Sequence, residues 1–328
     1  MSIPRTAQAI ACLGGLIFGV ALAARVNAQA WTPLKGEGSV TLTYQKVDVR
    51  DHFDSHGEEE DRGQIHTHNT ILALEYGLTD KFAIDFDVAY VASRFEPSQF
   101  DPRGRRPHGP DDDGFFHPKF QDIHVDVRYN AVQRPLVVTP FIGITIPTHD
   151  YEVRGHSAVG RGFREFRLGA NVGRQLNPFF PNGYVHLRYS YAILKHFQGF
   201  NLNHSNTDWE IGWFAHKAIS LRFIGSWQLS QGGLEFPEGV RLTPAQFEIH
   251  DRVARADYVQ LGGGVTFSVN RSFDIHTAYA KTVSARNTHG DGGIIIGFIW
   301  RFTSSRSSDR IAANTPTSKL PTLGNGMF

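Results

Sequence analysis

The stretch "EYGLTDKFAIDFDVAYVASRF", from Glu75 to Phe95, decides the fold class of this chain. After the turn-like "GLTD", every second residue is apolar: Phe82, Ile84, Phe86, Val88 and Tyr90. Asp85 and Asp87 lie between them, so the pattern predicts a β-strand with one apolar and one polar face. The apolar face must be covered by the core of a soluble β-protein or by lipid, and the rest of the chain has to decide between the two.

The same two-residue alternation recurs along the chain and predicts twelve strands. They are expected at residues 39–49, 67–77, 82–95, 120–130, 136–148, 163–175, 184–196, 207–214, 219–230, 257–267, 273–285 and 293–302. The connections are alternately short, as at 77–81, and long, at 50–66, 96–119, 149–162, 197–206, 231–256 and 286–292. Short periplasmic turns, longer extracellular loops and an even strand number are typical of outer-membrane barrels. We therefore predict an all-β fold, a transmembrane antiparallel up-and-down β-barrel of about 12 strands over residues 31–302.

Lipid and aromatic residues lead to two further expectations. Lipid offers no hydrogen bonds, so the last strand must pair with the first and leave no open edge. Two aromatic belts should mark the two bilayer interfaces. The belt near the short turns is expected to hold Phe82, Tyr129, Phe214, Phe267, Phe273, Trp300 and Phe302. The belt near the long loops is expected to hold Tyr90, Phe95, Phe120, Trp209, Trp227, Tyr258 and Tyr279.

Residues 1–30 are typical of a secretory signal peptide. The apolar run "AIACLGGLIFGVALAA" (Ala9–Ala24) is followed by "AQA" (Ala28–Ala30), which has the small-x-small form of a cleavage site, so cleavage is expected before Trp31. The single cysteine, Cys12, lies inside this segment, and the mature chain would therefore contain none. A cysteine-free chain suits export through an oxidising compartment.

Composition and the C-terminal residues limit the partners that the chain is expected to have. The chain of 328 residues is 41% hydrophobic and carries a formal net charge of +1, which gives no reason to expect nucleic acid as a partner. Residues 303–328 are rich in Ser, Thr, Pro and Gly, which predicts a disordered periplasmic tail. The spacing Gly297-x-x-Trp300-x-Phe302 resembles the C-terminal signal read by the barrel-assembly machinery.

Three short motifs carry a family resemblance. They are "YGLTD", "FQDIHVDVRY" (Phe120–Tyr129) and "PFIGITIPTHD" (Pro140–Asp150). In this order they resemble the MetA-pathway of phenol degradation family of outer-membrane proteins, which are regarded as transporters for small organic compounds. The resemblance implies a barrel and a transport role, and it implies no catalytic residues.

Charged residues on the polar strand faces are the main site candidates. The predicted pore-lining and solute-contacting residues are Asp85, Asp87, Asp126, Arg128, Arg167, Arg188, Glu210 and Arg222. Glu75, Glu165, Asp274 and Arg301 are expected in the lumen with them. The charges would either select solutes in a polar pore or form an ion-pair network that fills a narrow barrel, since buried charges must pair. Both interpretations hold if a narrow passage remains.

Histidine pairs and one charged loop offer weaker hypotheses. His52 with His56, and His66 with His68, are candidate zinc or copper ligands, but no third ligand is indicated by spacing. The loop "RGRRPHGPDDDG" (Arg103–Gly114) is either simply solvated or in contact with lipopolysaccharide phosphates and divalent cations. We expect no cofactor and no bound metal.

Catalysis is not indicated, because no His-x-Ser pair of the kind an outer-membrane phospholipase needs occurs in the chain. The sequence predicts a passive outer-membrane channel for small compounds, with aromatic or hydrophobic ones as candidates. A non-conducting structural, ligand-binding or metal-binding barrel is the alternative, and a hydrolase is a third one. The expected partners are outer-membrane lipid, lipopolysaccharide, the barrel-assembly machinery and a small-molecule solute.

Overall fold

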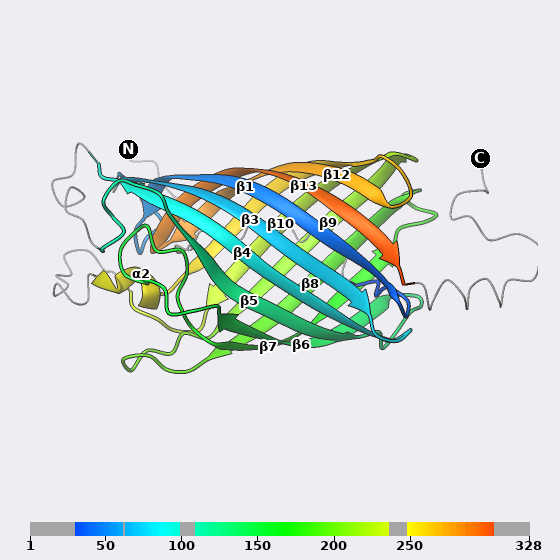
Figure 1. Ribbon diagram of the computed structural model, residues 1–328, viewed down its shortest axis with the longest axis horizontal. Helices are drawn as coiled ribbons and strands as arrows, with labels where there is room; N and C mark the ends of the chain where they lie inside the picture. The colour runs from blue at the N-terminus through cyan, green and yellow to red at the C-terminus, as the bar shows by residue number, and fades with distance from the viewer. Residues whose placement is uncertain (1–29, 62, 99–108, 236–247, 305–328) are drawn as a thin grey trace, which may run out of the picture.

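A computed structural model of the chain describes residues 30–61, 63–98, 109–235 and 248–304. Its long strands are β1 (Glu37–Phe53), β3 (Gln64–Gly77), β4 (Phe82–Glu96), β5 (His117–Tyr129), β6 (Val137–Pro147), β7 (Glu165–Gln175), β8 (Gly183–Leu194), β9 (His204–His216), β10 (Ile219–Ser230), β11 (Asp257–Ser268), β12 (Phe273–Arg286) and β13 (Thr288–Thr303). The two-residue strand β2 (Glu59–Glu60) pairs with the end of β1. A short helix, α2 (His250–Val253), lies in the connection between β10 and β11 (Figure 1).

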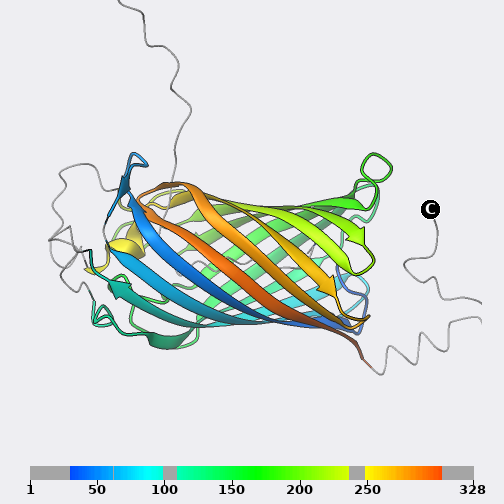
Figure 2. The ribbon, with the colours of Figure 1, turned by 90° about the horizontal axis from the view of Figure 1, so that it is seen from above.

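The long strands form one closed antiparallel barrel. Each strand pairs with its sequence neighbours, and β13 pairs with β1 from Glu37 opposite Thr303 to Phe53 opposite Thr288. Figures 1 and 2 show the closed wall from two directions, with the long loops and α2 at one end. We call this the external end, as in outer-membrane barrels generally, and the opposite end the short-turn end. The predicted fold class and strand order are confirmed.

The two faces of the wall differ as the alternation predicts. In β4, Phe82 and Tyr90 are each 42% exposed on the outside, whereas Asp85 is 8% exposed inside the barrel. The same outer face carries Ile142, Phe223 and Ile294, each about half exposed. A continuous apolar outer surface on a closed barrel is the lipid-facing band of an outer-membrane protein, so the predicted location agrees with the fold. None of the helices in the described part of the chain is long and apolar enough to cross a membrane.

Three sequence-based expectations for the external end are wrong. The connection expected over 286–292 is a single residue, Asn287, because β12 continues to Arg286 and β13 begins at Thr288. "THGDGG" contains polar and small residues that resemble a loop, yet they extend β13 beyond the lipid-facing region. Phe95 and Tyr258 do not join the external aromatic belt. Phe95 is 1% exposed inside an apolar cluster, and Tyr258 lines a cavity in the lumen.

Several predicted segments lie outside the described residues. They are the signal peptide up to residue 29, the tail beyond residue 304 and the basic half of the loop at 103–108.

Candidate functional site

A layer of ion pairs crosses the lumen, and Arg128 is its most buried member. The side chain of Arg128 is 0% exposed, and its Nε lies 2.8 Å from Oδ2 of Asp85 on the neighbouring strand β4. The same guanidinium donates to the carboxylate of Glu75 on β3. One arginine therefore holds two carboxylates from two successive strands, which is the pairing that a buried charge requires.

Asp126 forms the second group of the layer, with two arginines. Its carboxylate oxygens lie 2.8 Å from Nη2 of Arg167 and 2.7 Å from Nη2 of Arg188. The guanidinium of Arg188 also lies 3.8 Å from the ring centroid of Phe141, a cation–π distance. Gly143 leaves the space for this arrangement, because a Cβ atom there would lie 1.9 Å from Oδ1 of Asp126.

Two further groups extend the layer around the barrel. Glu210 on β9 accepts a hydrogen bond from the hydroxyl of Tyr184 and lies 3.4 Å from Nη1 of Arg222 on β10. Asp274 on β12 accepts from Arg301 on β13. The layer thus contains five carboxylates and five guanidinium groups, so its formal charges cancel.

Two cavities lie on either side of this layer. The upper cavity, toward the external end, has a volume of about 370 Å³, and the lower cavity, at the short-turn end, about 860 Å³. Glu75 lines both cavities, and the Tyr184–Glu210 hydrogen bond joins a residue of the lower lining to one of the upper lining. The ion-pair layer is therefore the partition between the two halves of the lumen.

Loops close the lumen at the external end by apolar packing. Tyr151 and Val159, from the connection between β6 and β7, pack against Ala89 and Val91 on the inner face of β4. The Tyr151 hydroxyl donates to Oδ1 of Asp122 at 2.5 Å. Burial and the Asp122 carboxylate raise the pKa of Tyr151, so the hydroxyl remains a donor.

The helix α2 closes the other side of the external end. Val253 packs with Ala192, Leu194 and Leu202 in a second apolar cluster. The guanidinium of the adjacent Arg252 lies 4.5 Å and 4.4 Å from the rings of two phenylalanines, Phe163 and Phe197. Two loops that are distant in sequence therefore cover the upper cavity together.

The start of the described chain enters the lower cavity. The carbonyl of Ala30 accepts a hydrogen bond from the hydroxyl of Thr139 at 2.6 Å. The indole of Trp31 lies edge-on to the ring of Tyr184, with the centroids 6.3 Å apart. This segment occupies part of the short-turn mouth and contacts a residue of the ion-pair layer.

The structure brings the eight predicted site residues to the inner face of the barrel, in two settings. Seven belong to the ion-pair layer: Asp85, Asp126, Arg128, Arg167, Arg188, Glu210 and Arg222. Asp87 lies above the layer in the upper cavity, where its Oδ1 is 2.7 Å from Nδ1 of His124. That any of them contacts a solute stays a prediction. Alternation puts His124 on the polar face of its strand, but sequence reasoning did not single out His124, Tyr184 or Gly143 as site residues, because their roles depend on strand register.

The histidine pairs suggested by the sequence do not form a metal site with other described residues. His66 and His68 share the outer face of β3, where His66 Nδ1 lies 2.8 Å from Asp48 and His68 Nδ1 lies 2.6 Å from the Tyr44 hydroxyl. His56 pairs with Asp54 in the loop. The described residues hold a different group of potential ligands, His156, His250 and Asp251.

Solved structures with a similar fold include outer-membrane barrels. The COG4313 outer membrane channel from Pseudomonas putida F1 matches with a TM-score of 0.62 and 11% sequence identity, over 83% of this chain and 98% of that chain. The translocator domain of autotransporter NalP from Neisseria meningitidis matches with a TM-score of 0.46 and 9% identity, over 85% and 93% of the two chains. No protein-family model and no curated protein sequence matches the chain. At such low identity the first likeness shows the barrel fold, and the resemblance to the MetA-pathway family stays a prediction.

Proposed function

We propose that this protein is a passive outer-membrane channel for small molecules, with the ion-pair layer as its internal barrier. The observation that carries the proposal is the pair of stacked cavities, with Glu75 lining both. A barrel filled only for stability would have no reason to keep two open volumes on the two sides of one charged layer. The COG4313 outer membrane channel, which has the same fold, supports this reading by analogy.

The upper cavity favours small compounds with both apolar and polar parts. Its volume of about 370 Å³ falls in the range of roughly 300–1,000 Å³ that is common for small-molecule pockets. Ile71, Ala89 and Ile224 provide apolar contacts, while Asp87 and His124 provide hydrogen-bonding groups. An aromatic or otherwise hydrophobic compound with one polar substituent is the solute that this lining fits best.

Passage requires two steps, because both cavities are bounded by closures. The external loops must separate from the inner face of β4, and the solute must then pass beside the ion pairs around Glu75. No energy source is needed for either step, so transport would follow the concentration gradient.

Ion selectivity of the refolded protein in planar bilayers tests the proposal. We expect discrete single-channel currents, and Asp87→Ala should shift the reversal potential in a salt gradient toward anion preference, because a negative charge leaves the upper cavity. Asp113→Ala is the control, since its side chain is 48% exposed in an external loop. Refolded protein that carries no current and admits no small aromatic solute into liposomes would contradict the proposal and favour a binding barrel.

A further inference from the structure

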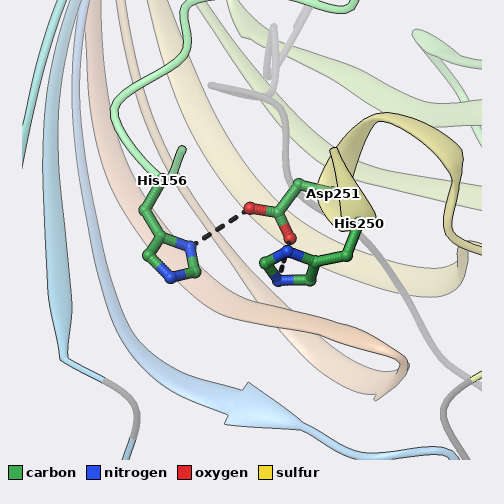
Figure 3. A group of neighbouring side chains, drawn as sticks. All are labelled: His156, His250 and Asp251. Atoms are coloured by element: carbon green, nitrogen blue, oxygen red, sulfur yellow. Dashed lines mark ion pairs between the residues drawn. The ribbon is translucent and has the colours of Figure 1, made fainter. Parts of the chain in front are cut away.

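Buried histidines gather beneath the external loops, away from the ion-pair layer. His156 belongs to the connection between β6 and β7, whereas His250 and Asp251 belong to α2 (Figure 3). These three residues are only 5%, 8% and 8% exposed. Two separate loops therefore place metal-ligating side chains in one enclosed position.

The ligand atoms of these three side chains converge on a small volume. One atom from each side chain lies within 4.8 Å of the other two. Asp251 is central, since its Oδ2 lies 3.1 Å from Nδ1 of His156 and its Oδ1 lies 2.8 Å from Nε2 of His250. Figure 3 shows both rings directed at this carboxylate.

Two further histidines surround the group from the barrel wall. The ring of His289, at the start of β13, is 5.7 Å from that of His156 and 4.8 Å from that of His52 on β1. His289 is 6% exposed, and its Nδ1 has no hydrogen-bond partner among the described residues. A buried imidazole nitrogen without a hydrogen-bond partner points to a bound ion that the neighbouring side chains coordinate together.

We propose that His156, His250 and Asp251 form a binding site for a divalent transition-metal ion, with Zn²⁺ as the best match. Imidazole nitrogens and a carboxylate oxygen are ligands that zinc accepts at about 2.0–2.2 Å, and three protein ligands with one open position are a common zinc arrangement. His289 is the adjacent side chain that can supply a fourth ligand. Hard cations such as Mg²⁺ and Ca²⁺ prefer all-oxygen sites and should bind poorly here.

The distances need only a small adjustment to admit the ion. Ligand atoms of a tetrahedral zinc site are separated by about 3.3 Å, as follows from bonds of about 2.0–2.2 Å. The two ion-pair contacts of Asp251 are slightly shorter, at 3.1 Å and 2.8 Å, so a metal would replace both of them by coordination.

The backbone around His156 is held by a second carboxylate. Asp112 accepts hydrogen bonds from the amides of His156 at 3.0 Å and Ser157 at 2.7 Å. The ring of Phe95 lies 4.6 Å from that of His156. Such supporting contacts orient metal ligands and reduce the cost of bringing them together.

Metal binding would join the two loops that cover the upper cavity. His156 comes from the connection between β6 and β7 and the other two ligands from the connection between β10 and β11, so an ion between them forms a cross-link at the external end. Binding measured in detergent micelles does not depend on any channel activity. A failure of the metal site would therefore not contradict the proposed channel function, and a failure of the channel function would not contradict the metal site.

Titration calorimetry with Zn²⁺ on the full-length protein, refolded without a histidine tag and stripped with EDTA, tests the site. We expect one ion per chain with micromolar or tighter affinity, and slower protease cleavage of the external loops when Zn²⁺ is present. His156→Gln and His250→Gln should each weaken binding at least tenfold. Asp251→Asn is a third variant of the same site, and heat-modifiable gel mobility shows whether each barrel has folded.

The histidines on the outer face of β3 supply matched controls. His66→Gln and His68→Gln remove the same side chain from the sequence-suggested pair and should leave the affinity unchanged. Saturable binding that survives His156→Gln, His250→Gln and Asp251→Asn would overturn the proposal. Equally, absence of binding to the wild-type protein at Zn²⁺ concentrations well above micromolar would overturn it.

Discussion

The lumen is closed in two places by two different kinds of interaction. At the external end, Tyr151 and Val159 seal the barrel through apolar contacts made by loops. In the middle of the lumen, Arg128 and its carboxylates seal it through ion pairs made by strands. Apolar contacts are non-directional and can form again in a new arrangement, whereas a half-broken buried ion pair leaves a charge without a partner. The loops are therefore the part that can move, whereas the charged layer stays in place.

Removal of Arg128 should have the largest effect on stability. Arg128→Ala leaves the carboxylates of Glu75 and Asp85 without their shared guanidinium, and breaking a buried pair in this way costs about 3–5 kcal/mol. We expect a loss of this size in the free energy of unfolding, measured by urea titration of the barrel in lipid vesicles. The same variant should increase cation preference in bilayer recordings, because one positive charge leaves the lumen.

A matched exposed pair sharpens this result. Lys46 and Asp48 lie 3.2 Å apart on the outer face of β1, with the lysine side chain 50% exposed. Lys46→Ala should cost at most about 1 kcal/mol, as exposed pairs usually do. Adding Asp85→Asn to Arg128→Ala should recover part of the lost stability, because fewer unpaired charges remain. Equal losses for Arg128→Ala and Lys46→Ala would show that the layer is not a permanent structural element.

Opening of the external closure should have an intermediate effect. Val159 is 1% exposed in its apolar cluster, and Val159→Asp would place a carboxylate there at a cost of several kcal/mol unless the loop moves away. We expect the loop to leave the barrel mouth, with higher single-channel conductance and faster protease cleavage within residues 148–164. The urea midpoint of the barrel should change little, since no strand residue is altered.

Val269→Asp is the control for this opening. Val269 lies in the short turn between β11 and β12 and is 58% exposed, so the same substitution at the other end should leave conductance and cleavage unchanged. A wild-type conductance for Val159→Asp would indicate that the loops are not the barrier at the external end.

The two closures also differ in how far the sequence predicts them. Alternation placed Asp85 and Arg128 on the inner faces of their strands, because the side-chain period of a strand is two. Their pairing depends on register, which aligns Asp85 with Asp126 and brings Arg128 within reach from two residues further along β5. Periodicity alone does not supply that register.

The loop residues were beyond sequence reasoning for a different reason. His156 and Asp251 are brought together by loops that fold into the barrel mouth, and loops have no side-chain period to interpret. His289 lies where the sequence predicts a loop, because polar and glycine residues at the start of β13 conceal the strand. The apolar character of Val159 and Val253 was the one available signal that these loops are buried.

The smallest predicted effect is that of low pH on the stability of the external loop between β6 and β7. Glu152 accepts a hydrogen bond from Nε of Arg154 at 2.8 Å and also from the backbone amides of Val153 and Arg154. The side-chain bond to Arg154 is the main reason that the pKa of Glu152 falls from 4.5 to about 2. A lowered pKa means that the pair stabilises the loop fully above pH 4.5 and loses this contribution as the pH falls toward 2.

Limited digestion with an acid protease can detect this contribution. At about pH 5, Glu152→Gln should be cleaved within residues 148–164 faster than the wild type, and near pH 2 the two rates should converge. The difference should be modest, because exposed ion pairs contribute little. Wild-type and variant rates that differ equally at both pH values would show that the ionised carboxylate is not what holds the loop. Convergence of the two cleavage rates would show that the acid sensitivity of the external closure comes from the Glu152–Arg154 ion pair. The apolar packing of the loop and the charged layer below it would then remain in place at low pH.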